Sequence, residues 1–192
     1  MMRKLLFILF IFFFLISGFS CRENFTPKPR GYPRIDFPEK VYTLYNSSKA
    51  FSFDYPVYAE VVPDRSVNAE QDWLNINFTQ MNGTIYLSYK TINKNLDRYI
   101  EDSRNFVYKH AIKAEHIPEI PFYRPESKVY GILYDIKGNA ASSVQFFITD
   151  STMHFVRGSL YFDTQPDKDS LAPVIQFVRE DIVHMINTFQ WK

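Results

Sequence analysis

The residue with the clearest potential for chemistry is Cys21, the only cysteine in the 192-residue chain. It lies shortly after an apolar run at residues 5–16, which is itself preceded by the positive pair Arg3 and Lys4. This pattern is typical of a secretory signal peptide, and the run is shorter than the roughly 20 apolar residues that a membrane-spanning helix needs. A cysteine at such a junction can be acylated. We therefore predict that residues 1–20 are a signal peptide and that Cys21 becomes an N-terminus carrying acyl chains such as palmitate.

A second group with chemical potential is Asp150, Ser151 and His154, which are the three residue types of a hydrolase triad. A serine nucleophile on a strand-to-helix elbow is flanked by glycines, and no glycine flanks Ser151. Asp and Ser are also ordinary residues of tight turns. We favour a turn between two strands and keep an unrecognised hydrolase as an alternative.

The remaining histidines and acidic pairs predict no catalytic residue, metal site or cofactor. The histidines lack the i, i+4 spacing of a helical metal site, and the chain has no HExxH, CxxC or glycine-rich phosphate motif. His110 is expected near the apolar face of a helix. The pairs Glu101–Asp102 and Glu180–Asp181 are expected on the polar sides of helices, where adjacent side chains do not converge.

Composition predicts a folded domain whose main partner is not a nucleic acid. Hydrophobic residues make up 46% of the chain and aromatic residues 18%, well above a disordered composition. Loss of Arg3 and Lys4 with the signal peptide changes the net charge from +1 to −1. A nearly neutral chain lacks the basic surface that nucleic-acid binding needs. A lone cysteine also allows no disulfide within the chain.

Residues 21–50 are predicted to be an extended arm, because several prolines interrupt them. Basic and aromatic side chains alternate along the arm, which a simple linker does not need. Two interpretations remain open. The arm packs its aromatic rings on the domain's own surface, or it is a docking strip for a partner, with these contact residues: Lys28, Arg30, Tyr32, Arg34 and Phe37.

Residues 51–192 are predicted to form one domain that begins with strands. Alternation of apolar and polar residues predicts strands at 51–55, 58–62, 73–78, 84–90, 129–137, 143–149 and 153–162. Asn82–Gly83 is a hairpin signal that should pair the strands on either side of it antiparallel. Gly158, inside a strand, indicates a bulge or a close contact.

Two amphipathic helices complete the pattern. One is predicted over residues 95–114. Residues 116–127 contain three prolines and are expected to form a loop. The second helix is near the C-terminus, capped by Asp169 or Ser170, with Pro173 in its first turn. The order of strands, helix, strand meander and helix predicts an α+β fold: an antiparallel sheet of about six strands with helices packed on its faces.

Several motifs spread over nearly the whole mature sequence are distinctive: Thr26–Pro38, Tyr108–Ala114, Gly138–Ser142, Thr149–Ser151, His154–Phe155, Arg157–Gly158, Leu160–Phe162 and Thr188–Lys192. Together they resemble the GldD family of gliding motility lipoproteins. The resemblance implies a role in Bacteroidetes gliding and type IX secretion. It also implies a non-catalytic envelope lipoprotein that is needed for the machinery and for the stability of a partner lipoprotein.

The order of elements is similar to the PsbP/Mog1 family, through the Phe-x-Phe-x-Tyr-Pro start at Phe51 and the Gly-Asn-Ala-Ala turn at Gly138. This resemblance implies an αβα sandwich in a family made up mostly of assembly and binding modules. Fold alone does not establish function.

Two short segments, Asp150-Ser151-Thr152 and Asp169-Ser170-Leu171, resemble the O-glycosylation pattern of Bacteroidetes proteins. Ser151 and Ser170 are therefore weak glycosylation candidates. A turn and a helix cap explain the same residues.

The expected function is that of an assembly or stability factor that binds other gliding and secretion lipoproteins and envelope proteins. The alternative is a periplasmic small-molecule or glycan-binding module, in which aromatic side chains stack on a ligand between arm and sheet. The segment after Cys21, Arg22-Glu23-Asn24, offers a single acid. We therefore expect a lipid anchor in the outer membrane that faces the periplasm.

Overall fold

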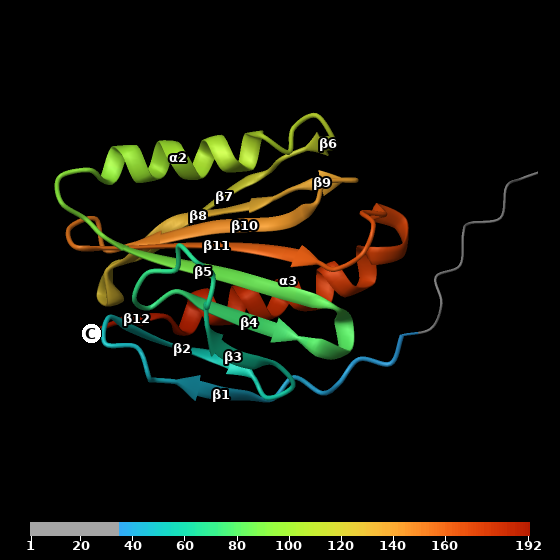
Figure 1. The fold of residues 1–192 in the computed structure, drawn as a ribbon, viewed down its shortest axis with the longest axis horizontal. Coiled ribbons are helices and arrows are strands. Elements are labelled where there is room, and N and C mark those ends of the chain that lie inside the picture. Colours follow the sequence, from blue (N-terminus) through green and yellow to red (C-terminus); the bar gives the residue numbers. More distant parts are fainter. Residues whose placement is uncertain (1–34) are drawn as a thin grey trace, which may run out of the picture. The chain divides into compact units, whose positions relative to one another are not determined.

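The computed structural model describes residues 35–192. The predicted signal peptide, Cys21 and the arm as far as residue 34 lie outside the described residues. The main sheet has seven strands in the order β3-β4-β5-β11-β10-β8-β7, and all neighbours are antiparallel (Figure 1). Its strands are β3 (Glu60–Pro63), β4 (Leu74–Phe78), β5 (Gly83–Thr91), β7 (Glu119–Arg124), β8 (Val129–Asp135), β10 (Ser142–Thr149) and β11 (His154–Phe162). The α+β class with a large antiparallel sheet is confirmed.

The predicted local strand pairs are also confirmed. β4 and β5 form the hairpin, with Asn82 in the left-handed conformation at a φ of 49°. β8, β10 and β11 form the meander. Gly158 marks a close contact and not a bulge, because a Cβ atom there would lie 2.0 Å from Cζ of Phe146 on the paired strand.

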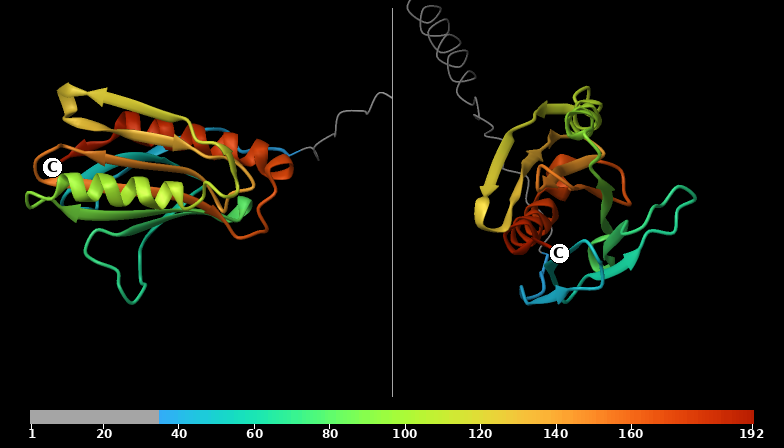
Figure 2. Two further views of the ribbon diagram at one scale, coloured as in Figure 1. Left: turned by 90° about the horizontal axis from the view of Figure 1, so that it is seen from above. Right: turned by 90° about the vertical axis from the view of Figure 1, so that its left-hand side faces the viewer.

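One helix packs on each face of this sheet (Figure 2). The sheet curves around α3 (Lys168–Thr188), and α2 (Leu96–Tyr108) lies on the other face. Successive residues of a strand point to opposite faces of the sheet, so one strand contributes to the core on each side. Val156 of β11 belongs to the larger core with α3, whereas Phe155 belongs to the smaller core with α2. None of the helices among residues 35–192 is long and apolar enough to span a membrane.

A small sheet packs against α3 and joins the two ends of the described chain. It contains β1 (Tyr42–Tyr45), β2 (Phe51–Pro56) and β12 (Gln190–Trp191), with β2 in the centre. Phe51 and Phe53 of β2 are fully buried with Phe189 of the C-terminal segment. The remaining short elements are β6 (Ala114–His116), β9 (Lys137–Gly138), and the 3-10 turns η2 (Thr79–Met81) and η3 (Pro125–Ser127).

The expected loop at residues 116–127 is wrong in its centre, because β7 pairs there with β8. Pro121 of β7 lies opposite Ile132. Since β7 is the outermost strand of the sheet, its unpaired side tolerates a residue without an N–H group.

Both helix boundaries also differ from the prediction. α2 ends at Tyr108 and not at residue 114. α3 is capped by Asp167, whose carboxylate accepts hydrogen bonds from the N–H groups of Asp169 and Ser170. The helix therefore starts two or three residues earlier than predicted, and Pro173 lies inside it, beyond the first turn.

Candidate functional site

The described end of the arm, residues 35–45, lies along the fold and is called the strap below. The ring of Phe37 stacks on Phe177 of α3, with 4.3 Å between ring centroids. Tyr42 stacks in the same way on His184, at 3.6 Å. Aromatic contacts with α3 therefore hold this part of the arm, as the first interpretation of the arm expects.

A buried carboxylate fastens the strap. Asp181 of α3 is 2% exposed, and its two oxygens accept three hydrogen bonds. Lys40 Nζ donates at 2.8 Å and the Tyr42 hydroxyl at 2.9 Å, both to Oδ1, while the Tyr58 hydroxyl donates to Oδ2 at 2.7 Å. Burial, followed by the hydrogen bond to Asp181, raises the pKa of Tyr42 and Tyr58 far above its ordinary value.

The structure corrects the expectation that Glu180 and Asp181 both lie on the polar side of their helix. The side chain of Glu180 is 51% exposed, but that of Asp181 is 1% exposed. Adjacent helical residues point about 100° apart, so one of them can face the strap while the other faces solvent. The partners of Asp181 come from distant segments, and helical periodicity cannot reveal them.

Asp150 and Ser151 lie in a turn, as favoured, and His154 follows it as the first residue of β11. Asp150 Oδ1 accepts hydrogen bonds from the N–H groups of Thr152, Met153 and His154 at 2.8–3.0 Å. Burial alone would raise the pKa of the Asp150 carboxyl, but these hydrogen bonds outweigh it and the pKa is lowered. Ser151 takes a left-handed φ of 68°. The carboxylate therefore organises the turn.

His154 faces aromatic partners. Its Nδ1 shares a 2.7 Å hydrogen bond with the Tyr89 hydroxyl, and its ring stacks on Trp191 at 5.1 Å. This histidine therefore serves as a packed ring that joins β11 to the C-terminus.

The structure places the other predicted site residues as follows. Ser151 and Ser170 are exposed, and the Ser170 hydroxyl donates to Asp167. Phe37 belongs to the strap. The lipidation site and the remaining arm residues lie outside the described residues: Cys21, Lys28, Arg30, Tyr32 and Arg34. Among residues 35–192, no group of three His, Cys, Asp or Glu side chains could hold a metal ion.

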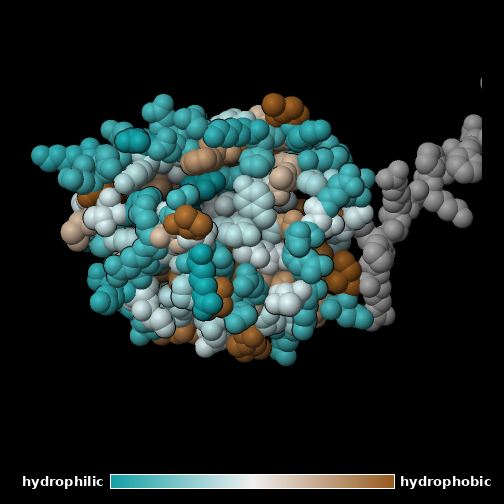
Figure 3. All heavy atoms as spheres, viewed as in Figure 1, coloured by the Kyte–Doolittle hydropathy of each residue, from teal (hydrophilic) through white to brown (hydrophobic). Residues whose placement is uncertain are grey.

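A groove that the sequence did not predict lies beside α2, where the helix leaves part of the sheet uncovered. The cavity has a volume of about 420 Å³. β5 and β11 form its floor, α2 forms one wall, and the segment before β4 forms the other. Its main lining side chains are Trp73, Tyr86, Tyr99, Phe106, Phe155 and Arg157. Figure 3 shows this face of the molecule, with pale aromatic side chains between more hydrophilic ones.

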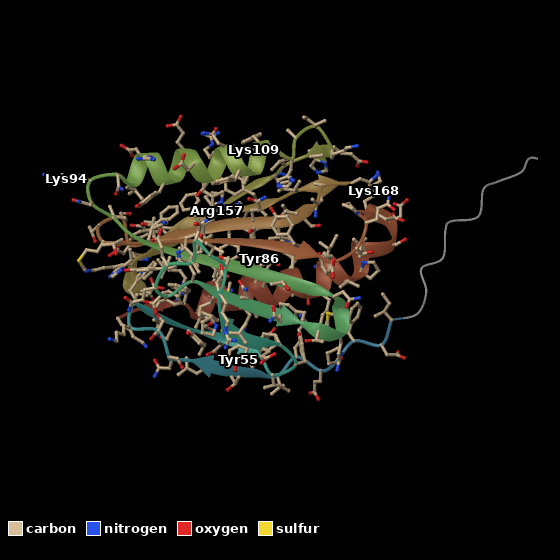
Figure 4. All side chains as sticks on the ribbon, in the orientation of Figure 1. Tyr55, Tyr86, Lys94, Lys109, Arg157 and Lys168 are labelled. Carbon is tan, nitrogen blue, oxygen red and sulfur yellow. The ribbon has the colours of Figure 1, made fainter. Side chains whose placement is uncertain are left out.

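Two charged side chains belong to the strands of the groove floor: Lys90 of β5, which forms an ion pair with Glu70, and Arg157 of β11 (Figure 4). Nη2 donates to Gln145 Oε1 at 2.8 Å, and the guanidinium carbon lies 4.5 Å from the centre of the Phe106 ring. Burial lowers the pKa of this guanidinium from its ordinary value. Strand alternation could have indicated the position, because Arg157 lies two residues after the buried Phe155 and so shares its face. The helix that turns this face into a groove wall could not be placed from the sequence.

Comparison with known proteins identifies the family. None of the curated proteins compared matches the chain. Among solved structures, the chain is similar to the PsbP protein (CyanoP) of Synechocystis sp. PCC 6803, with 11% identity and a TM-score of 0.48, over 83% of this chain and 98% of that one. The family model described as "Gliding motility lipoprotein GldD" matches residues 22–191. The chain therefore belongs to the GldD family of gliding motility lipoproteins.

Proposed function

We propose that this chain is a non-catalytic envelope lipoprotein that serves as an assembly or stability factor for the gliding motility and type IX secretion machinery. Family membership implies involvement in gliding motility and a lipid-anchored place in the envelope. The finer role, as a binder of other lipoproteins and envelope proteins, is our proposal. So are the outer membrane, the periplasmic orientation and the acylation of Cys21.

The observation that carries the proposal is the way in which the strap is fastened. A flexible tether would need no buried carboxylate, yet Asp181 holds Lys40 and Tyr42 of the strap against α3. The basic and aromatic residues 28–34 directly precede the strap in the sequence. A partner that binds this segment would therefore bind next to a strap that is already ordered on the domain and costs no further ordering entropy.

Combined replacement of Arg30, Tyr32 and Arg34 by alanine is expected to abolish capture of partner lipoproteins from solubilised envelopes while the melting temperature stays unchanged. The reason is that this segment supplies the cationic and aromatic contacts that dominate protein interfaces. Pull-down with mass spectrometry and a thermal melt would measure both effects.

The matched control replaces Arg65, Arg98 and Tyr123, which are exposed in the domain, by alanine. This control should capture partners as the wild type does. A marked drop in melting temperature of the arm variant would instead mean that the segment is part of the fold.

Replacement of Cys21 by alanine is expected to move the protein from the membrane fraction to the soluble periplasmic fraction. Lipid chains provide the anchor in this proposal, and no helix of residues 35–192 can replace them. Fractionation followed by immunoblotting measures the change. Sedimentation of the variant with membranes after an alkaline wash would show that another contact anchors the protein.

The alternative function, a small-molecule or glycan-binding module, is favoured by one observation, the aromatic groove beside α2. This groove lies beside α2, whereas the sequence predicted a ligand site between the arm and the sheet.

A further inference from the structure

The groove beside α2 contains a cation whose charge is poorly compensated. A guanidinium has five N–H donors, and the neutral amide oxygen of Gln145 accepts one from Arg157. Nε of Arg157 is buried and has no hydrogen-bond partner among residues 35–192. No ion pair of these residues includes Arg157. Arg157 is partly buried, and a partly buried charge without an opposite charge is costly for folding, so its presence calls for a compensating group.

Further positive charge surrounds the same end of the groove. The guanidinium carbon of Arg157 lies 4.5 Å from the centre of the Phe106 ring, and Lys109 Nζ lies 4.7 Å from the same centre. Figure 4 shows Lys109, at the C-terminal end of α2, above Arg157 of the sheet. Burial and the nearby Arg157 lower the pKa of His110, which follows Lys109. An anion placed here would relieve the repulsion between these groups.

The acidic side chains that line the groove already have partners. Asp64 accepts hydrogen bonds from the N–H and hydroxyl groups of Ser66, at 2.8 and 3.1 Å. Asp102 lies 3.8 Å from Arg98, one turn earlier on the outer side of α2. Neither forms an ion pair with Arg157, so the guanidinium of Arg157 is available to bind the anionic group of a ligand.

The rest of the groove is suited to an apolar body. Tyr86 of β5 is 46% exposed, and the lining also contains the rings of Trp73, Tyr99 and Phe155. Concave sites of this size lined by aromatic rings, with a few polar groups to orient the ligand, are typical of small-molecule sites. Tyr86 and Arg157 lie on the neighbouring strands β5 and β11 (Figure 4).

We propose that this groove binds a small organic carboxylate, with its carboxylate on Arg157 and its aromatic or aliphatic body against Tyr86 and the other rings. A guanidinium binds a carboxylate through two parallel hydrogen bonds, which gives both affinity and orientation. The inference gives the alternative function a ligand class. It does not rest on the arm, so failure of the partner-capture experiment leaves it untouched.

The test is a titration of the isotope-labelled full chain without its signal peptide, followed by NMR. The probes are 3-phenylpropionate, its neutral analogue 3-phenylpropan-1-ol, and octanoate. The acid should produce saturable shifts at the backbone amides of Ser88, Ser103 and Ser159, which line the groove. The alcohol should bind at least about tenfold more weakly. Comparison of octanoate with the aromatic acid tells which body the rings prefer.

Arg157→Met should weaken binding of the acid by about tenfold or more and leave binding of the alcohol unchanged. Its melting temperature without ligand should stay close to that of the wild type, because removal of the uncompensated charge offsets loss of the hydrogen bond to the buried Gln145. The matched control, Arg104→Met, removes an exposed arginine of α2 that does not line the groove, and it should change neither quantity.

Three results would overturn the proposal. The first is the absence of saturable shifts in the groove with either acid at millimolar concentration. The second is equal binding of acid and alcohol by the wild type, a comparison that needs no variant. The third is unchanged binding of the acid by Arg157→Met.

Discussion

Asp181→Ala is expected to lower the free energy of unfolding by about 3 kcal/mol. The carboxylate is buried and accepts hydrogen bonds from Lys40, Tyr42 and Tyr58. Alanine would leave these donors around a small void, and removal of one partner of a buried charged pair is costly. In a domain of this size the melting temperature should fall by about 6–12 °C. Chemical denaturation followed by circular dichroism measures the change.

The neighbouring Glu180→Gln is the matched control. Glu180 also approaches Lys40, with 3.4 Å between Nζ and Oε2, but its side chain is 51% exposed. Exposed ion pairs contribute little, so this variant should stay within about 0.5 kcal/mol of the wild type. Equal effects of the two substitutions would contradict the view that the buried carboxylate fastens the strap.

The same cluster should make stability fall at alkaline pH. A tyrosine whose pKa is raised by folding stabilises the folded state fully below its ordinary pKa of about 10, and this contribution is lost as the pH rises further. Tyr42 and Tyr58 both have raised pKa values, because of burial and then of the hydrogen bond to Asp181. The wild type should therefore lose stability above about pH 10. Tyr42→Phe combined with Tyr58→Phe should show a flatter dependence.

Gly131→Ala is expected to cost about 3 kcal/mol, because it places a methyl group where β8 and β10 are in contact. A Cβ atom at Gly131 would lie 1.9 Å from the backbone oxygen of Phe147 and 2.5 Å from Cζ of Phe122. A backbone oxygen inside a sheet cannot move away as a side chain can. The change should lower the denaturant midpoint, measured by urea unfolding.

Gly83→Ala provides the comparison for this prediction. A Cβ atom at Gly83 would first meet Cε1 of the Phe162 ring, at 3.0 Å. The ring can shift by a few tenths of an ångström, and alanine also reduces the entropy of the unfolded chain. The cost should stay below about 1 kcal/mol. A cost for Gly131→Ala no greater than that for Gly83→Ala would show that the sheet relaxes around the contact.

Local signals predicted the elements that depend on neighbouring residues. The alternation around Asn82–Gly83 predicts the β4–β5 hairpin, since a short turn brings its two strands together. The meander of β8, β10 and β11 follows from the same rule. The signal peptide and the acylated cysteine also rest on local sequence, and they remain predictions.

Long-range pairing was beyond such signals. β5 pairs with β11 over nine residue pairs, from His154 opposite Thr91 to Phe162 opposite Gly83. The sequence of neither strand identifies the other as its partner. Several apolar strands of this chain could pair with either of them equally well until the whole core is packed. In the sequence, Pro121 argues against a strand at residues 119–124. An edge strand can contain a proline, but that β7 is an edge strand becomes known only from the strand order of the folded sheet.

By itself the sequence determined the class of fold, the family and the predicted place of attachment at Cys21, because composition, periodicity and short motifs are local properties. The tertiary structure decided two features, the burial of Asp181 and the groove that contains Arg157. Asp181 is a buried anchor because the strap covers that side of α3. Arg157 lies in a groove because α2 covers part of one sheet face and leaves the rest open. Burial depends on which distant segments pack together, and a residue's own neighbours in the chain do not specify that.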